Sequence, residues 1–163
     1  MVFSSVLFLF LFLPLVLLGN ALAPKKFRNT FLFIGSLLFY FWGETDLIGI
    51  IIFSILINYL GGLIIDKVAI RRKAVLLITV ALNFVVLIYY KYFFFLIDNI
   101  NSFIGFDSST MEEIKGIRLP MGISFFTFQG VSYVVDVYRK QAKAQVNPIN
   151  IGLYISLFPQ LIA

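Results

Sequence analysis

The segment LPMGISFFTFQGVSYVVDVYR, residues 119–139, is as long as one membrane crossing yet carries polar side chains along its length. With a turn of about 100° per residue in a helix, its polar groups share one arc. This arc holds Gln129, Ser132, Tyr133 and Asp136. Because polar groups within a bilayer avoid lipid, we expect the arc to face protein or water.

Other residues of this segment have structural interpretations. Pro120 fits a helix start, since the first turn offers no partner for the N–H that proline lacks. Asp136 and Arg139 are three residues apart, which favours either an ion pair at the membrane boundary or a place for Asp136 along an aqueous path. The other sides of the predicted helix hold Ile123, Val134 and Val137.

The composition is that of an integral membrane protein. Of the 163 residues, 61% are apolar and 13% are charged, and the mean hydropathy is +0.99. Since a bilayer core needs about 20 helical residues per crossing, the chain has room for about six spans. Apolar runs occupy residues 2–23, 27–42, 47–65, 74–97, 119–138 and 149–163. We predict an all-α, polytopic transmembrane bundle with about five complete spans and the start of a sixth.

Along the chain, basic connections alternate with acidic or mixed connections between these runs. The first, third and fifth connections are basic and hold Lys25, Lys26, Arg28, Lys67, Arg71, Arg72, Lys73, Arg139, Lys140 and Lys143. The second is acidic, and the fourth, residues 98–118, is mixed. The positive-inside rule therefore predicts a multi-pass protein of the bacterial cytoplasmic membrane with its N-terminus outside. The net charge of +5 lies in short clusters beside apolar runs, which is typical of topogenic charge and not of nucleic-acid binding.

The residue types that are absent exclude several chemistries. The chain has no cysteine, which rules out disulfides, thiolate metal ligands and thiol nucleophiles. It has no histidine, the commonest general base. We therefore expect no metal site, no bound cofactor and no catalytic residue within these residues.

Further polar residues lie inside apolar runs: Asn58 in the third, and Asn83 and Lys91 in the fourth, where Asn83 has the same two interpretations as Asn58. Asn58 follows Ser54 by four residues and precedes Gly61 by three, which indicates a helix-packing seam or, alternatively, contact with a substrate. Lys91 lies six residues from the end of the fourth run, where its long stem can carry the ammonium to the interface.

The two ends of the chain also carry signals. Residues 1–23 resemble a signal peptide, but the basic residues follow the apolar core, so we expect a retained anchor. The last run contains Pro159 and Gln160, and a helix broken by proline at membrane depth must lie within protein or line a cavity. We interpret residues 1–163 as a single transmembrane domain, cut inside a sixth helix and forming the N-terminal portion of a longer protein.

With residues 119–139 and the later YISLFPQLIA, the chain resembles the membrane-bound O-acyltransferase (MBOAT) family, in its alginate O-acetylase-like branch. The opening MVFSSVLFLFLFLPLVLL and the SLLFYFWGE of residues 36–44 are also similar to these proteins. The resemblance implies acyl transfer, most simply of acetyl, from a cytoplasmic thioester donor such as acetyl-CoA or acyl carrier protein. The acceptor would be an exported polysaccharide or a periplasmic or extracellular acceptor protein.

The resemblance also implies a catalytic histidine in a later part of such proteins, so this chain alone should be inactive. Gln129, Ser132, Tyr133, Asp136 and Gln160 are then candidates to line or support an acyl tunnel. Candidate structural residues are Pro120, Arg139, Pro159 and Asn58. Two other classes remain open: a transporter, which lacks a carboxylate relay at mid-membrane depth, and a non-catalytic scaffold of a polysaccharide secretion complex.

Overall fold

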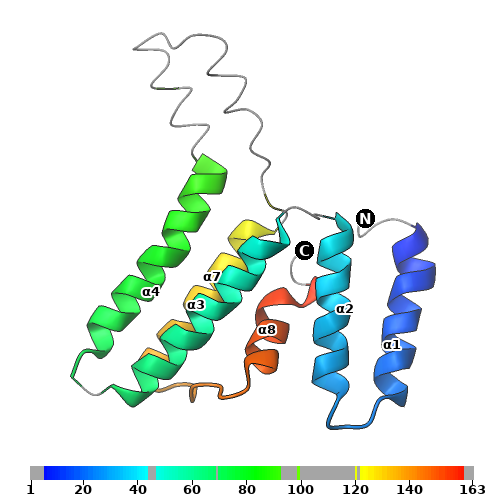
Figure 1. Ribbon diagram of the computed structural model, residues 1–163, viewed down its shortest axis with the longest axis horizontal. Helices are drawn as coiled ribbons and strands as arrows, with labels where there is room; N and C mark the ends of the chain where they lie inside the picture. Colours follow the sequence, from blue (N-terminus) through cyan, green and yellow to red (C-terminus); the bar gives the residue numbers. More distant parts are fainter. Residues whose placement is uncertain are drawn as a thin grey trace.

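The computed structural model describes residues 6–43, 47–68, 70–92, 99, 120 and 122–159 (Figure 1). Every element in this part of the chain is a helix, which confirms the all-α class. In chain order the elements are η1 (Phe8–Phe12), α1 (Leu13–Leu22), α2 (Arg28–Gly43), α3 (Ile48–Lys67), α4 (Arg72–Leu87), η2 (Ile88–Tyr92), α7 (Ile123–Tyr138) and α8 (Pro148–Ser156). The two η elements are π-helical turns that continue directly into or out of an α-helix.

Two helical segments are long and apolar enough to cross a membrane. They are Ile48–Lys67, which is α3, and Arg72–Tyr92, which is α4 continued by η2. The other helices are shorter, and α2 and α7 have 16 residues each, which gives about 24 Å against the roughly 30 Å of a bilayer core. Helices of this composition are consistent with a membrane protein, and the five-span bundle remains a prediction.

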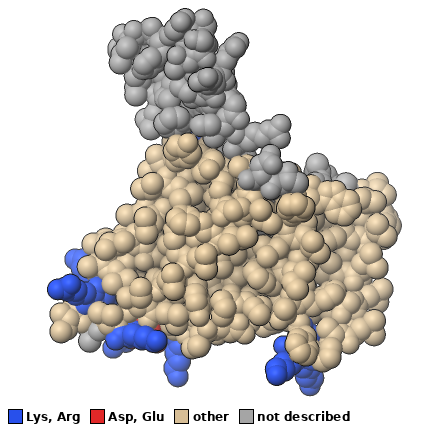
Figure 2. Space-filling model, viewed as in Figure 1, with Lys and Arg blue, Asp and Glu red and all other residues tan. Residues whose placement is uncertain are grey.

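Basic side chains gather at one end of the molecule (Figure 2). The connections α1–α2, α3–α4 and α7–α8 all lie at this end, because successive helices run in opposite directions (Figure 1). We call this the basic end. The three basic connections of the sequence therefore lie at one end of the molecule, as the positive-inside rule expects of helices that cross a membrane in turn.

The helix α7 begins at Ile123, three residues later than the sequence predicts. The residue before it, Gly122, has φ 73° in the left-handed region, so the backbone cannot continue from Pro120 as one α-helix. Pro120 is buried and accepts a hydrogen bond from the backbone N–H of Ile123 at 3.3 Å. It therefore belongs to the turn that precedes the helix, and its predicted place in the first helical turn is wrong.

The helix α8 ends at Ser156, before Pro159. Its start is fixed by Asn147, whose side-chain oxygen accepts a hydrogen bond from the N–H of Ile149 at 2.9 Å, with Pro148 in the first turn. The early end agrees with the predicted interruption of the last apolar run. Gln160 lies outside the described residues.

The main core is formed where α3, α4 and α7 pack together, with α8 against one side. Glycines let the backbones approach. A Cβ on Gly61 would stand 2.6 Å from the Thr79 hydroxyl oxygen, and one on Gly62 would stand 2.6 Å from the Tyr133 hydroxyl oxygen. Such small-residue contacts are the usual basis of helix association in membranes. There the surrounding lipid tails are as apolar as the side chains, so the hydrophobic effect does not drive helices together.

A second, aromatic cluster joins η1 and α1 to α2. It holds the rings of Phe8, Phe12, Phe39 and Phe158, whose centroids lie 5.1 to 5.9 Å apart. Aromatic pairs at this spacing favour tilted and edge-to-face geometry. Together with α8, this cluster connects the α1–α2 pair to the rest of the molecule.

Candidate functional site at the basic end

A polar pocket lies between the end of α7, the connection that follows it and α8. Its volume is about 310 Å³. The lining residues are Tyr133, Asp136, Ala142, Lys143, Gln145, Asn150, Ile151 and Tyr154. Two of the predicted site residues, Tyr133 and Asp136, therefore meet in one cavity, and Lys143 places the pocket at the basic end.

Tyr133 is buried and fixes one wall of the pocket. Its hydroxyl oxygen accepts a hydrogen bond from the backbone N–H of Gln145 at 3.0 Å, which leaves the hydroxyl proton free to donate. A second tyrosine, Tyr59 of α3, donates to the backbone oxygen of Val146 at 2.8 Å. The connection after α7 is thus held by tyrosines from two helices.

Asp136 is half-buried and presents a carboxylate to the pocket. Among the described residues no ion pair joins it to Arg139, which is exposed, so the predicted i,i+3 pair is not formed. The reason is the backbone: α7 ends here with Lys140 at φ 61°, and the Asp136 carbonyl oxygen accepts hydrogen bonds from the N–H groups of Gln141 and Ala142. This is the bonding pattern of a left-handed helix cap.

The far wall of the pocket is held to α2. Asn29 Nδ2 donates to Asn150 Oδ1 at 3.0 Å, which joins the first turn of α2 to α8. The pocket is therefore lined by a carboxylate residue, a lysine, two amide residues and two tyrosines, a set that can donate and accept hydrogen bonds to a polar ligand.

The remaining polar residues of α7 are not gathered at this pocket. Gln129 is half-buried and Ser132 is exposed. The packed face of α7 instead holds Ile123, Phe126, Thr127, Gly130, Tyr133, Val134 and Val137. The expectation that Ile123, Val134 and Val137 lie away from the buried face is therefore wrong. Small and β-branched side chains, which allow close contact with α3 and α4, determine the orientation of α7 more than its polar groups do.

Asn58 forms a reciprocal amide pair with Asn83. Each side-chain nitrogen donates to the other side-chain oxygen at 3.0 Å, and the second donors reach the backbone oxygens of Ser54 and Thr79 at 2.8 Å. Both amides are buried, at 0% and 3% exposure. Gly130 of α7 packs directly on Asn58. All four side-chain N–H donors of the pair are used and both side chains are buried, which favours the interpretation as a packing seam.

Two arginines at the basic end have roles that the sequence analysis missed. Arg72 donates from Nε to the oxygen of Ile65, and from one terminal nitrogen to the oxygens of Val137 and Tyr138, at 3.0 to 3.2 Å. Arg28 donates to Ala23 and Ala21 at the end of α1. Cations at helix C-termini complement the partial negative charge there. Their place in the short basic connections between two apolar runs is the signal that could have indicated this role.

Lys91 lies at the opposite end, in η2. Its ammonium donates to the Ser124 hydroxyl at 3.1 Å and lies 5.7 Å from the ring centre of Tyr92. The side chain is exposed, as expected for a lysine that reaches an interface. Within the described part of the chain, no group of three or more acidic, histidine or cysteine side chains is placed to hold a metal ion.

Comparison with known proteins finds relatives that are named as O-acetylases or O-acetyltransferases. It is 38% identical over 166 residues to a probable alginate O-acetylase of Azotobacter vinelandii, covering 100% of this chain and 33% of the relative. It is 39% identical over 166 residues to a probable alginate O-acetylase of Pseudomonas aeruginosa, covering 100% of this chain and 32% of that protein. It is also 30% identical over 195 residues to a peptidoglycan O-acetyltransferase of Helicobacter pylori, covering 36% of that protein.

The chain therefore spans about a third of the length of the curated relatives it matches. No family model matches it, and no solved structure matches it significantly. The whole-chain similarity confirms the resemblance predicted from the sequence, to the alginate O-acetylase-like branch of the membrane-bound O-acyltransferase family.

Proposed function

We propose that the chain is part of a membrane O-acyltransferase that moves acetyl groups from a cytoplasmic thioester donor toward hydroxyls of an exported polysaccharide such as alginate. The observation that carries this proposal is the identity of 38% and 39% to two alginate O-acetylases over 100% of the chain. The donor would be acetyl-CoA or an acyl carrier protein. The acceptor would be the polysaccharide or a periplasmic or extracellular protein that passes the acetyl group on.

The polar pocket at the basic end supports this proposal. Under the positive-inside rule the basic end faces the cytoplasm, where a thioester donor is found. Tyr133, Asp136 and Lys143 then lie on the donor side, where they can hold polar parts of a ligand or support a passage through the helices. Gln129, Ser132 and Gln160 remain candidates for tunnel lining.

The chemistry itself requires a group that these residues do not supply. General-base activation of a hydroxyl contributes roughly 10²- to 10⁴-fold and needs a base with a pKa near neutrality. The chain has no histidine. We therefore propose that these residues position helices and ligand, and that they do not turn over substrate unaided.

The function is tested by removing the gene and measuring the O-acetyl content of the exported polysaccharide. Loss of acetyl esters, restored by the complete gene, is the expected result. An unchanged ester content would contradict the proposal. The purified 163-residue chain, given labelled acetyl-CoA and polysaccharide, should show no turnover, and turnover would direct mutagenesis first to Asp136 and Lys91.

The orientation is tested separately by labelling engineered cysteines with an impermeant reagent, since the chain contains no cysteine of its own. A cysteine at Gln141, at the basic end, should be protected in intact cells. A cysteine at Ser109, which lies outside the described residues, should be labelled strongly. Equal labelling at both positions would reverse or refute the proposed orientation.

A further inference from the structure

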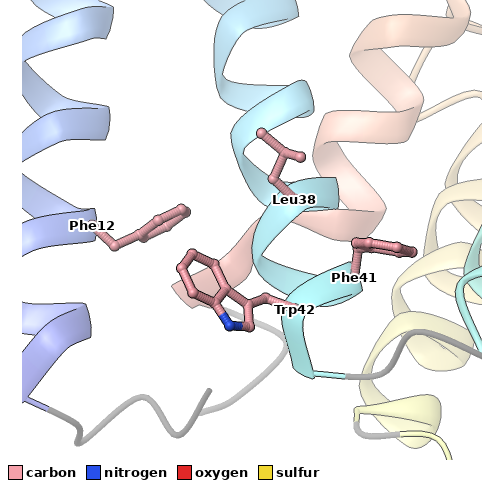
Figure 3. A pocket seen from close by; sticks show the side chains of 4 residues that line it. All are labelled: Phe12, Leu38, Phe41 and Trp42. Carbon is pink, nitrogen blue, oxygen red and sulfur yellow. The ribbon is translucent and has the colours of Figure 1, made fainter.

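An apolar cleft and the polar pocket differ in chemical character. The apolar cleft has a volume of about 540 Å³ and is lined by Phe12, Leu38, Phe41 and Trp42. The indole nitrogen of Trp42 is the only polar side-chain atom of these four residues (Figure 3). A polar ligand would lose its hydrogen bonds to water there and gain almost none in return. The polar pocket at the basic end is therefore the better place for the polar part of an acyl donor.

The polar pocket is closed on one side by the connection between α7 and α8, which two tyrosines hold in place. Tyr133 of α7 accepts the backbone N–H of Gln145 at 3.0 Å, and Tyr59 of α3 donates to the backbone oxygen of Val146 at 2.8 Å. We call these two hydroxyl groups the tyrosine clamp. We propose that Tyr59 and Tyr133 are positioning residues for acetyl transfer, a role that rests on the proposed function. They would act by keeping the connection in the place where the pocket can bind the donor.

The tyrosine clamp is anchored in the core. Tyr133 is buried, and a Cβ on Gly62 of α3 would stand 2.6 Å from its hydroxyl oxygen. The backbone of α3 therefore packs directly against this phenol and restricts its movement. Tyr59 is half-buried, and its side chain packs against the same core. The two hydroxyl groups thus connect residues 145–146 to helices α3 and α7.

The clamped residues determine where two walls of the pocket stand. Lys143 and Gln145 of the connection line the pocket. Asn147 follows the clamped residues directly and caps α8, and Asn150 of α8 also lines the pocket. A shift of the connection would therefore move these groups relative to Asp136 of α7, which forms the third wall.

Loss of one clamp hydroxyl should lower the fraction of molecules in which the pocket is formed. Phenylalanine at either position keeps the ring and leaves one backbone group of the connection without its partner. The apparent dissociation constant of a ligand rises as the binding-competent fraction falls, whereas the complex, once formed, is unchanged. A positioning role therefore predicts a higher KM for the donor at an unchanged kcat.

The test uses the complete protein in native membrane vesicles, with labelled acetyl-CoA as the donor and deacetylated alginate as the acceptor. Tyr59→Phe and Tyr133→Phe should each raise the KM for acetyl-CoA by about three- to fivefold and leave kcat unchanged. Tyr138→Phe is the matched control. It makes the same change at the end of α7, where the hydroxyl forms no hydrogen bond within the described residues, and should leave both constants unchanged.

A second measurement reports on the clamp without any activity. Trypsin cleaves after lysine and arginine, and Lys143 is the exposed site nearest to the clamped residues. Cleavage there requires the connection to open locally. In the detergent-solubilised complete protein, both clamp variants should be cut after Lys143 about three- to fivefold faster than the parent. Tyr138→Phe should be cut at the parent rate, and mass spectrometry identifies the site.

The two measurements together distinguish the possible failures. Unchanged cleavage in both clamp variants would mean that the hydroxyl groups do not hold the connection, and would overturn the proposal. Faster cleavage with an unchanged KM, or a lower kcat at constant KM, would also overturn it, because the clamp would then not position the donor pocket. Absence of acetyl transfer by the complete parent protein would instead refute the proposed function, and the positioning role would fall with it.

Discussion

The core of α3, α4 and α7 and the pair formed by α1 and α2 use different side chains to pack helices. In the core, glycines bring the backbones together and two buried amides pair between α3 and α4. In the pair, phenylalanine rings fill the space and a cleft remains open. Small residues and amides specify one register, whereas rings that contact each other at several angles tolerate change.

This contrast predicts where the molecule is sensitive to substitution. In the core, an added methyl group at Gly61, Gly62 or Gly130 overlaps a side chain of the neighbouring helix. In the α1–α2 pair, a methyl group at Gly35 meets Val16 at an ordinary distance, whereas one at Gly19 meets the far end of the Phe31 ring, which is a side chain that can move. Four pairs of substitutions test this difference. Three pairs compare one residue of the core with one residue of the α1–α2 pair, and the fourth compares a single with a double substitution in the core.

The largest effect is expected from alanine at core glycines. A Cβ on Gly130 overlaps the Asn58 amide, so Gly130→Ala must displace a saturated buried pair or move α7. Gly35→Ala, in α2, brings its Cβ to 3.6 Å from Val16, an ordinary contact. We expect Gly130→Ala to lower the free energy of unfolding by about 3 kcal/mol and Gly35→Ala by less than about 0.5 kcal/mol. Titration with SDS in mixed micelles measures both, and equal losses would remove the distinction between the two regions.

The amide pair should give the next largest effect. Asn58→Leu leaves the Asn83 side-chain oxygen and one of its N–H groups without a partner in the core, and we expect a loss of about 1 to 2 kcal/mol in the free energy of unfolding. The double variant Asn58→Leu, Asn83→Leu removes both polar groups and should recover part of that loss. A double-mutant cycle by the same titration measures the coupling. A coupling of zero would mean that the pair contributes nothing to the register of α3 and α4.

Some features of this structure can be predicted from the sequence, and others depend on contacts between distant residues. Helices and the basic end are consequences of local composition and charge, so they could be predicted. The contacts of Asn58 with Asn83, and of Arg72 with the end of α7, join residues 25 and 65 or 66 positions apart. No local pattern specifies such partners. Polarity predicts Tyr133 and Asp136 as site residues. Their shared pocket, however, depends on the backbone path of the connection between α7 and α8, which the sequence does not reveal.

The packed face of α7 shows why polarity alone misled the prediction. In water, the buried face of a helix is its apolar face. Between helices in a bilayer, the closest contacts go to small residues, and Gly130 provides one. Ser132 could therefore remain exposed while Val134 was buried. The glycines themselves, Gly130 in α7 and Gly61 and Gly62 in α3, were the available signal.

A smaller difference is expected between the two capping arginines. Arg72 donates to helix ends of both α3 and α7, whereas Arg28 donates only to the end of α1. Lysine keeps the charge but loses the planar set of donors. Arg72→Lys should lower the free energy of unfolding by about 1 kcal/mol, and Arg28→Lys by less than about half of that. If the two variants unfold at the same SDS fraction, Arg72 does not connect the core helices energetically.

The smallest effect concerns the helix ends themselves and has the opposite sign. Lys140 follows α7 with φ 61°, a conformation that costs a side-chain-bearing residue about 1 kcal/mol and costs glycine nearly nothing. Lys140→Gly should therefore raise the free energy of unfolding by about 0.5 kcal/mol, after the larger entropy of glycine in the unfolded chain is subtracted. Ala23, which follows α1 with φ −66°, is the matched control. Ala23→Gly gains nothing from relieved strain and should lower stability by about 0.5 kcal/mol, because only the unfolded-state term remains. Both variants are compared with the parent chain in the same SDS titration, with far-UV circular dichroism to verify helix content. A loss of stability in Lys140→Gly equal to that in Ala23→Gly would mean that the left-handed turn after α7 is not strained. The backbone at the end of α7 would then be no more demanding than the backbone at the end of α1.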